Sequence, residues 1–220
     1  TCGICCGTSL GFRCATTCFG GEIWSLTTDQ TTIPYPDDEP ELMGDGTPYE
    51  LVVTADTGST SRDEDTGQLF QRFIGDEVEK AEAEIDAVQA MDLPDAIKTL
   101  VLVEEVYPKY NLTAEAIDAL LTLIEQGTET AYIYRLLGDL YVKSGLQLSA
   151  EESYQTAIEL AAAEPNLEEQ TLTYLGLGTL YQTVNKSEKA KDALEQAQIG
   201  ATELGDSDLV SSIEDQLSRP

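Results

Sequence analysis

An internal repeat constrains this chain more than any single residue does. Two segments align position by position at an offset of 40 residues, and a weaker third copy lies 34 residues upstream of the first of them. The aligned positions are Leu100, Val103, Glu104, Tyr107, Asn111, Ala116, Leu120 and Leu123; Tyr134, Leu137, Gly138, Tyr141, Gly145, Ala150, Tyr154 and Ala157; and Tyr174, Leu177, Gly178, Tyr181, Asn185, Ala190, Leu194 and Ala197. A fixed period of this size indicates a helical solenoid, because one helical hairpin cannot bury its apolar face without stacking on a neighbour.

The spacing within each copy predicts two helices joined by a tight turn. Leu137, Gly138 and Tyr141 fall on one helical stripe, and a second stripe follows after the turn. The position between the stripes is occupied in the three copies by Asn111, Gly145 and Asn185. These residue types tolerate the left-handed conformation that ends a helix. We expect Thr113 and Ser187 to cap the helices that follow.

The aromatic, Leu-Gly, Tyr and Ala positions of the two better copies resemble the tetratricopeptide repeat, and the resemblance covers residues 93–204. It implies antiparallel helix pairs stacked into a right-handed superhelix, with a concave face that binds peptides or protein segments. The first copy departs from the family with Glu104 at a small-residue position and Pro108 near the end of its first helix. The second copy has six extra residues, 161–166, which should lengthen its second helix or its exit loop.

By the family's geometry, the first helix of each pair lines the concave face. The candidate partner-binding residues are therefore Lys98, Val101 and Glu105 in the first copy, Tyr132, Arg135, Asp139, Val142 and Lys143 in the second, and Leu175, Thr179, Gln182 and Thr183 in the third. Each of these residues could equally be an ordinary exposed helix position. A narrower resemblance links YELVVTADTGSTSRDED and YRLLGDLYVKSGLQLSAEESY to exported tetratricopeptide proteins of cyanobacteria.

The charge of the chain excludes one class of partner. Lys and Arg number 12 against 41 Asp and Glu, so the formal net charge is −29. A polyanion of this kind is repelled by nucleic-acid phosphates and by anionic membrane surfaces, so we expect no nucleic-acid partner. The sequence has no apolar run near the roughly 20 residues that cross a bilayer. We therefore expect no membrane span, and the acidic excess is typical of a solvated surface.

All five cysteines lie in the first 18 residues, at Cys2, Cys5, Cys6, Cys14 and Cys18. Such clustering in a short segment with little core of its own favours disulfides formed in an oxidising compartment. Free thiols and a metal site are the alternatives, although the chain has no histidine and no second C-x-x-C pair. The odd count leaves at least one thiol free or paired with another chain. We expect an extracellular or periplasmic protein, and the absence of an initiator methionine before Thr1 is compatible with removal of an export signal.

The pattern before the repeats predicts an N-terminal arm over residues 1–67 with a few strands and acidic loops. Residues 21–33 and 49–55 are rich in β-branched residues and favour strands, while residues 35–48 are rich in Pro, Gly and acids and favour a loop. Two or three strands cannot form a stable sheet alone, so we expect the solenoid or another subunit to complete them. Asp63, Asp65 and Gly67 resemble a calcium loop only faintly, because Ile74 replaces the bidentate Glu.

From Gln68 the period becomes helical, and residues 68–220 are predicted to form the repeat domain. A lead-in helix before the repeats and a short amphipathic helix over residues 207–217 should cap the array. The predicted fold is therefore mainly α: a tetratricopeptide-like solenoid of about three hairpins with capping helices, preceded by a small Cys-rich region that contains strands.

The sequence carries no recognisable catalytic arrangement. Without histidine there is no Ser–His or Cys–His pair, and no phosphate-binding glycine loop is present. We therefore predict no enzyme, no catalytic residue, no cofactor and no bound metal. Two functions remain, both with protein partners. The chain is either a structural subunit that self-assembles through its N-terminal arm, or a scaffold that binds a peptide or protein segment in its concave face.

Overall fold

The computed structural model describes residues 12–18, 21–28, 42, 47–55, 57, 60–61, 68–71, 75–163 and 165–218. The chain forms two compact units, residues 1–91 and residues 92–220. The boundary that the sequence suggests at residue 67 rests on a change of periodicity, and it stays a prediction.

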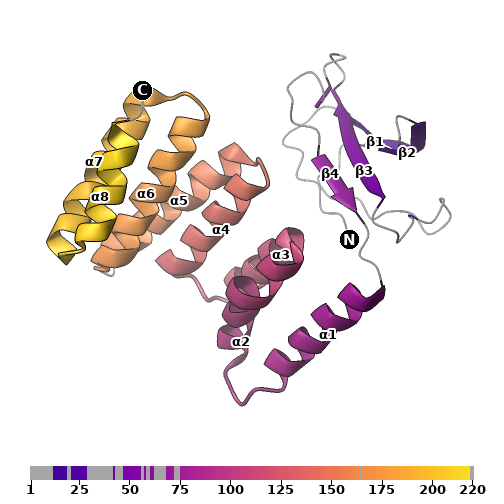
Figure 1. Cartoon of the computed structure of the whole chain (residues 1–220), viewed down its shortest axis with the longest axis horizontal. Helices are drawn as coiled ribbons and strands as arrows, with labels where there is room; N and C mark the ends of the chain where they lie inside the picture. Colours follow the sequence, from indigo (N-terminus) through magenta and orange to yellow (C-terminus); the bar gives the residue numbers. More distant parts are fainter. Residues whose placement is uncertain are drawn as a thin grey trace. The chain divides into compact units, whose positions relative to one another are not determined.

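Three helical hairpins make up most of the second unit, and they follow one another along the array (Figure 1). The first hairpin joins α2 (Asp95–Val101), η1 (Leu102–Val106) and η2 (Tyr107–Tyr110) to α3 (Thr113–Glu125); the second pairs α4 (Ala131–Lys143) with α5 (Gln147–Ala163); and the third pairs α6 (Leu167–Thr183) with α7 (Ser187–Leu204). A last helix, α8 (Ser207–Leu217), packs against α7. The predicted solenoid of three hairpins with a C-terminal cap is confirmed.

The turns inside the hairpins form as the sequence predicts. Asn111, Gly145 and Asn185 have φ values of 52°, 73° and 56°, which lie in the left-handed region. The predicted caps are wrong by one position, because Thr113 and Ser187 are the first helical residues of α3 and α7 and the residues before them make no side-chain cap bond. Side-chain caps occur instead at Thr130, Asn166 and Asp206, which immediately precede α4, α6 and α8.

The aligned apolar positions supply the core of this unit. Leu137, Tyr154 and Leu177 lie in one cluster with Leu120 of the first hairpin. Leu194, Ala197 and Ala201 of α7 form a second cluster with Ile213 of α8, which is fully buried. Residues 161–163 belong to α5, whereas residues 165–166 precede α6, so the extra residues of the second copy are divided between its second helix and its exit loop.

The first hairpin departs from regular geometry where the sequence departs from the repeat. Its first helix widens into a π-helical turn, η1, and ends in the 3-10 turn η2. Pro108 has no N–H to donate to the carbonyl of Glu104, so a regular helix cannot continue through this point. Glu104 occupies the position of the buried Gly138 and Gly178, yet it is exposed while Val103 stays buried. The wider turn therefore keeps the carboxylate out of the core.

The first unit contains a four-stranded antiparallel sheet, with the strand order β2-β1-β3-β4. Its strands are β1 (Phe12–Cys18), β2 (Gly21–Thr28), β3 (Pro48–Thr54) and β4 (Gln68–Gln71). Trp24 is buried against Leu51 and Val53, and Tyr49 stacks on Phe70 with ring centroids 5.6 Å apart. The expectation that this arm holds too few strands for a sheet is wrong, because β1 and β4 complete it.

The lead-in helix begins later than the sequence suggests. Residues 68–71 form β4, and the helix α1 runs Gly75–Gln89 with Ala81 and Val88 buried. The backbone of Cys14 and Cys18 lies in β1, whereas Cys2, Cys5 and Cys6 and the side chains of all five cysteines lie outside the described residues.

Candidate partner-binding face

The candidate residues of the second copy form one stripe along α4. Tyr132, Arg135, Asp139 and Lys143 recur at helical spacing, and the packing of Leu137 and Gly138 into the core turns this stripe outward. We call the surface formed by the candidate residues of α2, η1, α4 and α6 the first-helix face. Its central part is a polar network that joins the second and third hairpins.

Arg135 is the centre of this network. Its Nε donates to Glu169 Oε2 of α6 at 2.8 Å, and its Nη1 donates to Asp139 Oδ2 on the same helix at 3.1 Å. The guanidinium also lies 5.2 Å from the ring centroid of Tyr132, a cation–π distance. The Arg135 and Glu169 side chains are only 14% and 13% exposed. The Arg135 guanidinium therefore bonds to residues of this chain and is largely shielded from solvent.

Tyr132 lies at the end of the network. Partial burial, and then its interaction with the Glu104 carboxylate, raise the pKa of Tyr132 well above its ordinary value. Through the contacts of Arg135, Tyr132 and Glu169 belong to one network that joins α4 to α6.

Tyr154 supports the network from behind. Its hydroxyl donates to Asp139 Oδ1 at 2.6 Å, and its ring is 2% exposed. The ring lies between two helices, because a Cβ placed on Gly138 of α4 would be 2.6 Å from Tyr154 Cε1, and one on Gly176 of α6 would be 2.9 Å from the same atom. Glycine at both positions is required for this close approach.

The third-copy candidates are in contact with α8. Thr179 and Gln182 bond to Gln216 of α8, at 3.2 Å to its side-chain oxygen and 3.1 Å to its backbone oxygen. Leu175 packs in the apolar cluster that α8 shares with α7. Thr183 is exposed, and its hydroxyl donates to the carbonyl of Leu180. The structure therefore brings together the second-copy residues, while α8 takes up contacts of three third-copy residues.

The first-copy candidates lie on α2 and η1. Lys98 is 15% exposed at its side chain, with its Nζ 3.7 Å from Asp95. Val101 is half-buried, and Glu105 is exposed in η1. At the other end of the stripe, Val142 is half-buried and packs on the core, and the exposed Lys143 borders a shallow depression. Besides Lys143, the depression is lined by Val103, Tyr107, Pro108, Leu112, Thr113, Ala116 and Leu140.

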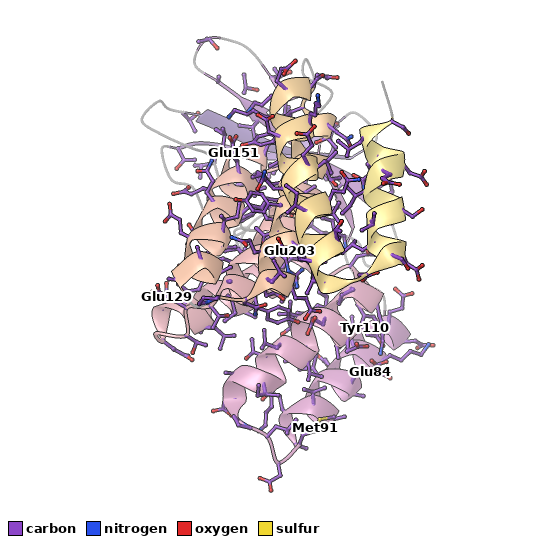
Figure 2. All side chains as sticks on the ribbon, turned by 90° about the vertical axis from the view of Figure 1, so that its left-hand side faces the viewer. Glu84, Met91, Tyr110, Glu129, Glu151 and Glu203 are labelled. Carbon is purple, nitrogen blue, oxygen red and sulfur yellow. The ribbon has the colours of Figure 1, made fainter. Side chains whose placement is uncertain are left out.

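A second polar cluster joins α5 to α6 and α7. Glu151, labelled in Figure 2, accepts hydrogen bonds from the Tyr181 hydroxyl at 2.7 Å and from Lys186 and Lys189 at 3.1 Å each. The Tyr181 hydroxyl, and then the two ammonium groups, lower the pKa of Glu151 to about 2. Both lysines also lie over the Tyr181 ring. This cluster ties the second hairpin to the third.

Among the residues that the structure describes, no group of three or more Cys, Asp or Glu side chains is placed to hold a metal ion. In the same part of the chain, no helix is both long and apolar enough to cross a membrane.

Sequence reasoning missed four residues that act on the first-helix face. Glu169 and Tyr154 bond to the α4 stripe, Glu104 raises the pKa of Tyr132, and Gln216 bonds to the third copy. The repeat gave no signal for Glu169, because the position equivalent to Arg135 in the next copy is Leu175, 40 residues later. The roles of Glu104 and Gln216 depend on the π-helical turn and on how α8 packs.

Comparison with known proteins supports the same fold. The family model of the tetratricopeptide repeat matches residues 131–164 and 172–198, which are the second and third copies. Among solved structures, BtubC (BKLC) from P. vanneervenii matches with a TM-score of 0.52 at 20% identity, over 64% of this chain and 62% of that protein. The match thus spans less than two thirds of the length of BtubC.

Two crystal structures of MamA match with a TM-score of 0.43 at 19% identity. They cover 63% and 64% of this chain and 89% and 85% of MamA. No curated protein matches the chain.

Proposed function

We propose that the chain is a non-enzymatic scaffold that binds a protein segment on its first-helix face, because residues 131–164 and 172–198 match the family model of the tetratricopeptide repeat. Repeats of this family serve protein–protein interaction, and stacked hairpins offer an extended surface to a partner. The single observation that supports this face is the network of Tyr132, Arg135, Asp139 and Glu169. It holds polar side chains of the second and third hairpins in one arrangement at the surface where these hairpins meet.

The contacts of α8 limit the part of the first-helix face that a partner can reach. Because Thr179 and Gln182 bond to Gln216, a partner that reached them would have to share or displace the contacts of α8. We therefore place the partner over η1, α4 and the first half of α6, with Glu105 and Lys143 at its margins.

The test is site-specific photo-crosslinking in an extract of the source cells. A photoreactive amino acid replaces Glu105 or Lys143, both exposed, or Glu152 on the outer side of α5 as the matched control. We expect the first two positions to capture the same protein and the control to capture none of it. Equal capture from all three positions, or capture only from the control, would contradict the proposal.

Self-assembly of an exported subunit through the N-terminal arm is the second candidate. One observation favours it: β2, eight residues long, lies at an edge of the described sheet. Edge strands are templates for pairing with another chain. The net charge of −29 opposes contact between copies, so assembly should strengthen as salt screens the repulsion. Light scattering of the intact chain over a concentration and salt series tests this, and a monomer at every condition would refute it.

A further inference from the structure

The depression beside Lys143 lies at the junction of the first and second hairpins. Its wall is formed by residues of η1, η2, α3 and α4, and the lining is mostly apolar, with Val103 and Ala116 among its buried members. The open space measures about 10 Å³, which is room for one water molecule or one methyl group. A small aliphatic group of a partner fits this space, whereas an aromatic ring does not.

The same position of the repeat is covered more fully at the next junction. Leu180 of α6 follows Leu140 of α4 by 40 residues, and it is 2% exposed while Leu140 is only half-buried. The first helix of the second hairpin, α4, runs regularly to its end, whereas that of the first hairpin ends in η1 and η2. The irregular end of the first hairpin therefore coincides with the opening beside Leu140.

The ammonium group at the rim of the depression has no counter-ion in the described part of the chain. Lys143 is exposed and makes no ion pair there, although Asp139 stands one turn earlier on the same helix. Asp139 bonds instead to Arg135 and to the Tyr154 hydroxyl. With 41 acids and 12 Lys and Arg in the chain, an unpaired lysine is an exception that calls for an acid from outside.

The lysines at the next junction show the contrast. Lys186 and Lys189 both bond to Glu151 of the preceding hairpin, so their charge is matched within the chain. At the first junction an apolar depression and an unmatched ammonium group lie side by side, because Lys143 is itself part of the lining.

We propose that the depression and Lys143 together bind a partner segment in which a small aliphatic side chain, such as alanine or valine, adjoins an acidic side chain. One methyl group fills the depression, and the carboxylate accepts from the Lys143 ammonium. The inference rests on the proposed function, since it names the chemistry of the partner at the Lys143 margin of the first-helix face. The net charge of −29 opposes a strongly acidic segment, so a single carboxylate matches the single free cation.

The probe for this site is isobutyrate, which carries two methyl groups and a carboxylate. Acetate and isobutyramide are the comparisons, because the first lacks the branched methyl groups and the second lacks the charge. Amide NMR of the full chain follows residues 112–116 and 140–143, which include the lining of α3 and α4, during each titration. We expect saturable shifts with isobutyrate, and a Kd about threefold lower than for either comparison.

Two variants separate the apolar contact from the ionic one. Lys143→Gln should raise the Kd of isobutyrate about threefold and leave that of isobutyramide unchanged. Lys191→Gln removes the same charge from an exposed position of α7 and should change neither value. Val103→Ile adds one methyl group to the lining, about the space available, and should weaken both probes. Amide shifts away from the depression report whether each variant keeps the fold.

Four results would overturn the inference. The absence of saturable shifts at these amides would remove the site, and equal effects of Lys143→Gln and Lys191→Gln would reduce it to general charge. Equal binding of acetate would show that the depression takes no methyl group, and equal binding of isobutyramide would remove the acidic partner. Photo-crosslinking at Glu105 tests the proposed face independently, so the two proposals can fail separately.

Discussion

The Tyr154 ring shows how a single residue position sets the packing of two hairpins. In most helices a change from glycine to alanine stabilises, by about 0.5–1 kcal/mol, because alanine loses less backbone entropy on folding. At Gly138 we expect alanine to be less stable than glycine, because the new Cβ would lie 2.6 Å from Tyr154 Cε1 and 2.7 Å from Cδ1. The ring cannot move away, because Gly176 lies on its other side.

We therefore predict that Gly138→Ala destabilises the chain, and that Gly138→Leu costs at least about 1–3 kcal/mol through overpacking. The fully buried Ala157 should respond to a bulky residue in the same direction. Urea unfolding of purified variants measures the effect, with Lys143→Ala as the exposed control on the same helix. A stabilising Gly138→Ala, or an equal loss in the control, would show that the ring is not confined as described.

At the scale of elements, α8 has the role of a structural cap. Ile213 is fully buried in the cluster that holds Leu194, Ala197 and Ala201 of α7. We predict that Ile213→Ala lowers the free energy of unfolding by about 2–4 kcal/mol, since it leaves a cavity where α8 meets α7. The neighbouring exposed Ser212 provides the control, and Ser212→Ala should change stability by less than about 0.5 kcal/mol. Denaturant melts that show the same midpoint for both variants would contradict the capping role.

The Glu151 cluster makes the junction between the second and third hairpins sensitive to acid. The pKa of Glu151 lies near 2 in the folded chain against an ordinary 4.5, so the folded state binds fewer protons than the unfolded state between these values. Its contribution to stability is therefore complete above about pH 4.5 and is lost as the pH falls towards 2.

We predict that Glu151→Gln lowers the free energy of unfolding at pH 7 by about 1–2 kcal/mol, as expected for the loss of hydrogen bonds to a charged group. The difference between the parent chain and this variant should shrink as the pH falls from 4.5 to 2. Chemical melts across this range measure it, with Glu152→Gln as the matched control. A difference that stays constant with pH would show that Glu151 does not keep its charge through these contacts.

At the scale of the whole molecule, we make a prediction about the oxidation state of the five cysteines. Their confinement to the first 18 residues motivates the proposal of an oxidising compartment, and we predict that most of the five are oxidised in native material. Intact mass before and after alkylation under native and reducing conditions decides this. Five freely alkylated thiols without reductant would refute both the disulfides and the argument for export that depends on them.

Features that depend on residues close together in the sequence could be predicted, whereas features that depend on distant residues could not. The repeat and its left-handed turns at Asn111, Gly145 and Asn185 could be read directly, because they follow from local spacing and backbone preference. The four-stranded sheet could not, since β4 joins β3 through long-range pairing and its sequence begins what looks like a helical run. In the candidate face, the α4 stripe was predictable from the geometry of the resembled family together with the helical period.

The partners of that stripe were not predictable in the same way. Glu169 and Glu104 reach Arg135 and Tyr132 only because the hairpins stack at a particular offset, which no single copy of the repeat specifies. The contacts of Thr179 and Gln182 with Gln216 likewise depend on how α8 packs against the third hairpin.

The Tyr154 ring, shared by α4 and α6, has a dynamic consequence. Separation of either helix from α5 exposes the same buried ring, and separation of α4 also releases Asp139 from the Tyr154 hydroxyl. The second and third hairpins should therefore open together, and their backbone amides should exchange with solvent deuterium at a common rate set by one opening event. Among the described residues, η1 and η2 have irregular hydrogen bonding and lie outside this shared contact, so this part of the first hairpin can fray while α3 stays packed in the core. Local motion would then be greatest on the side of the proposed face where Glu104 and Glu105 stand, which would let that end adapt to a bound segment while the rest stays rigid.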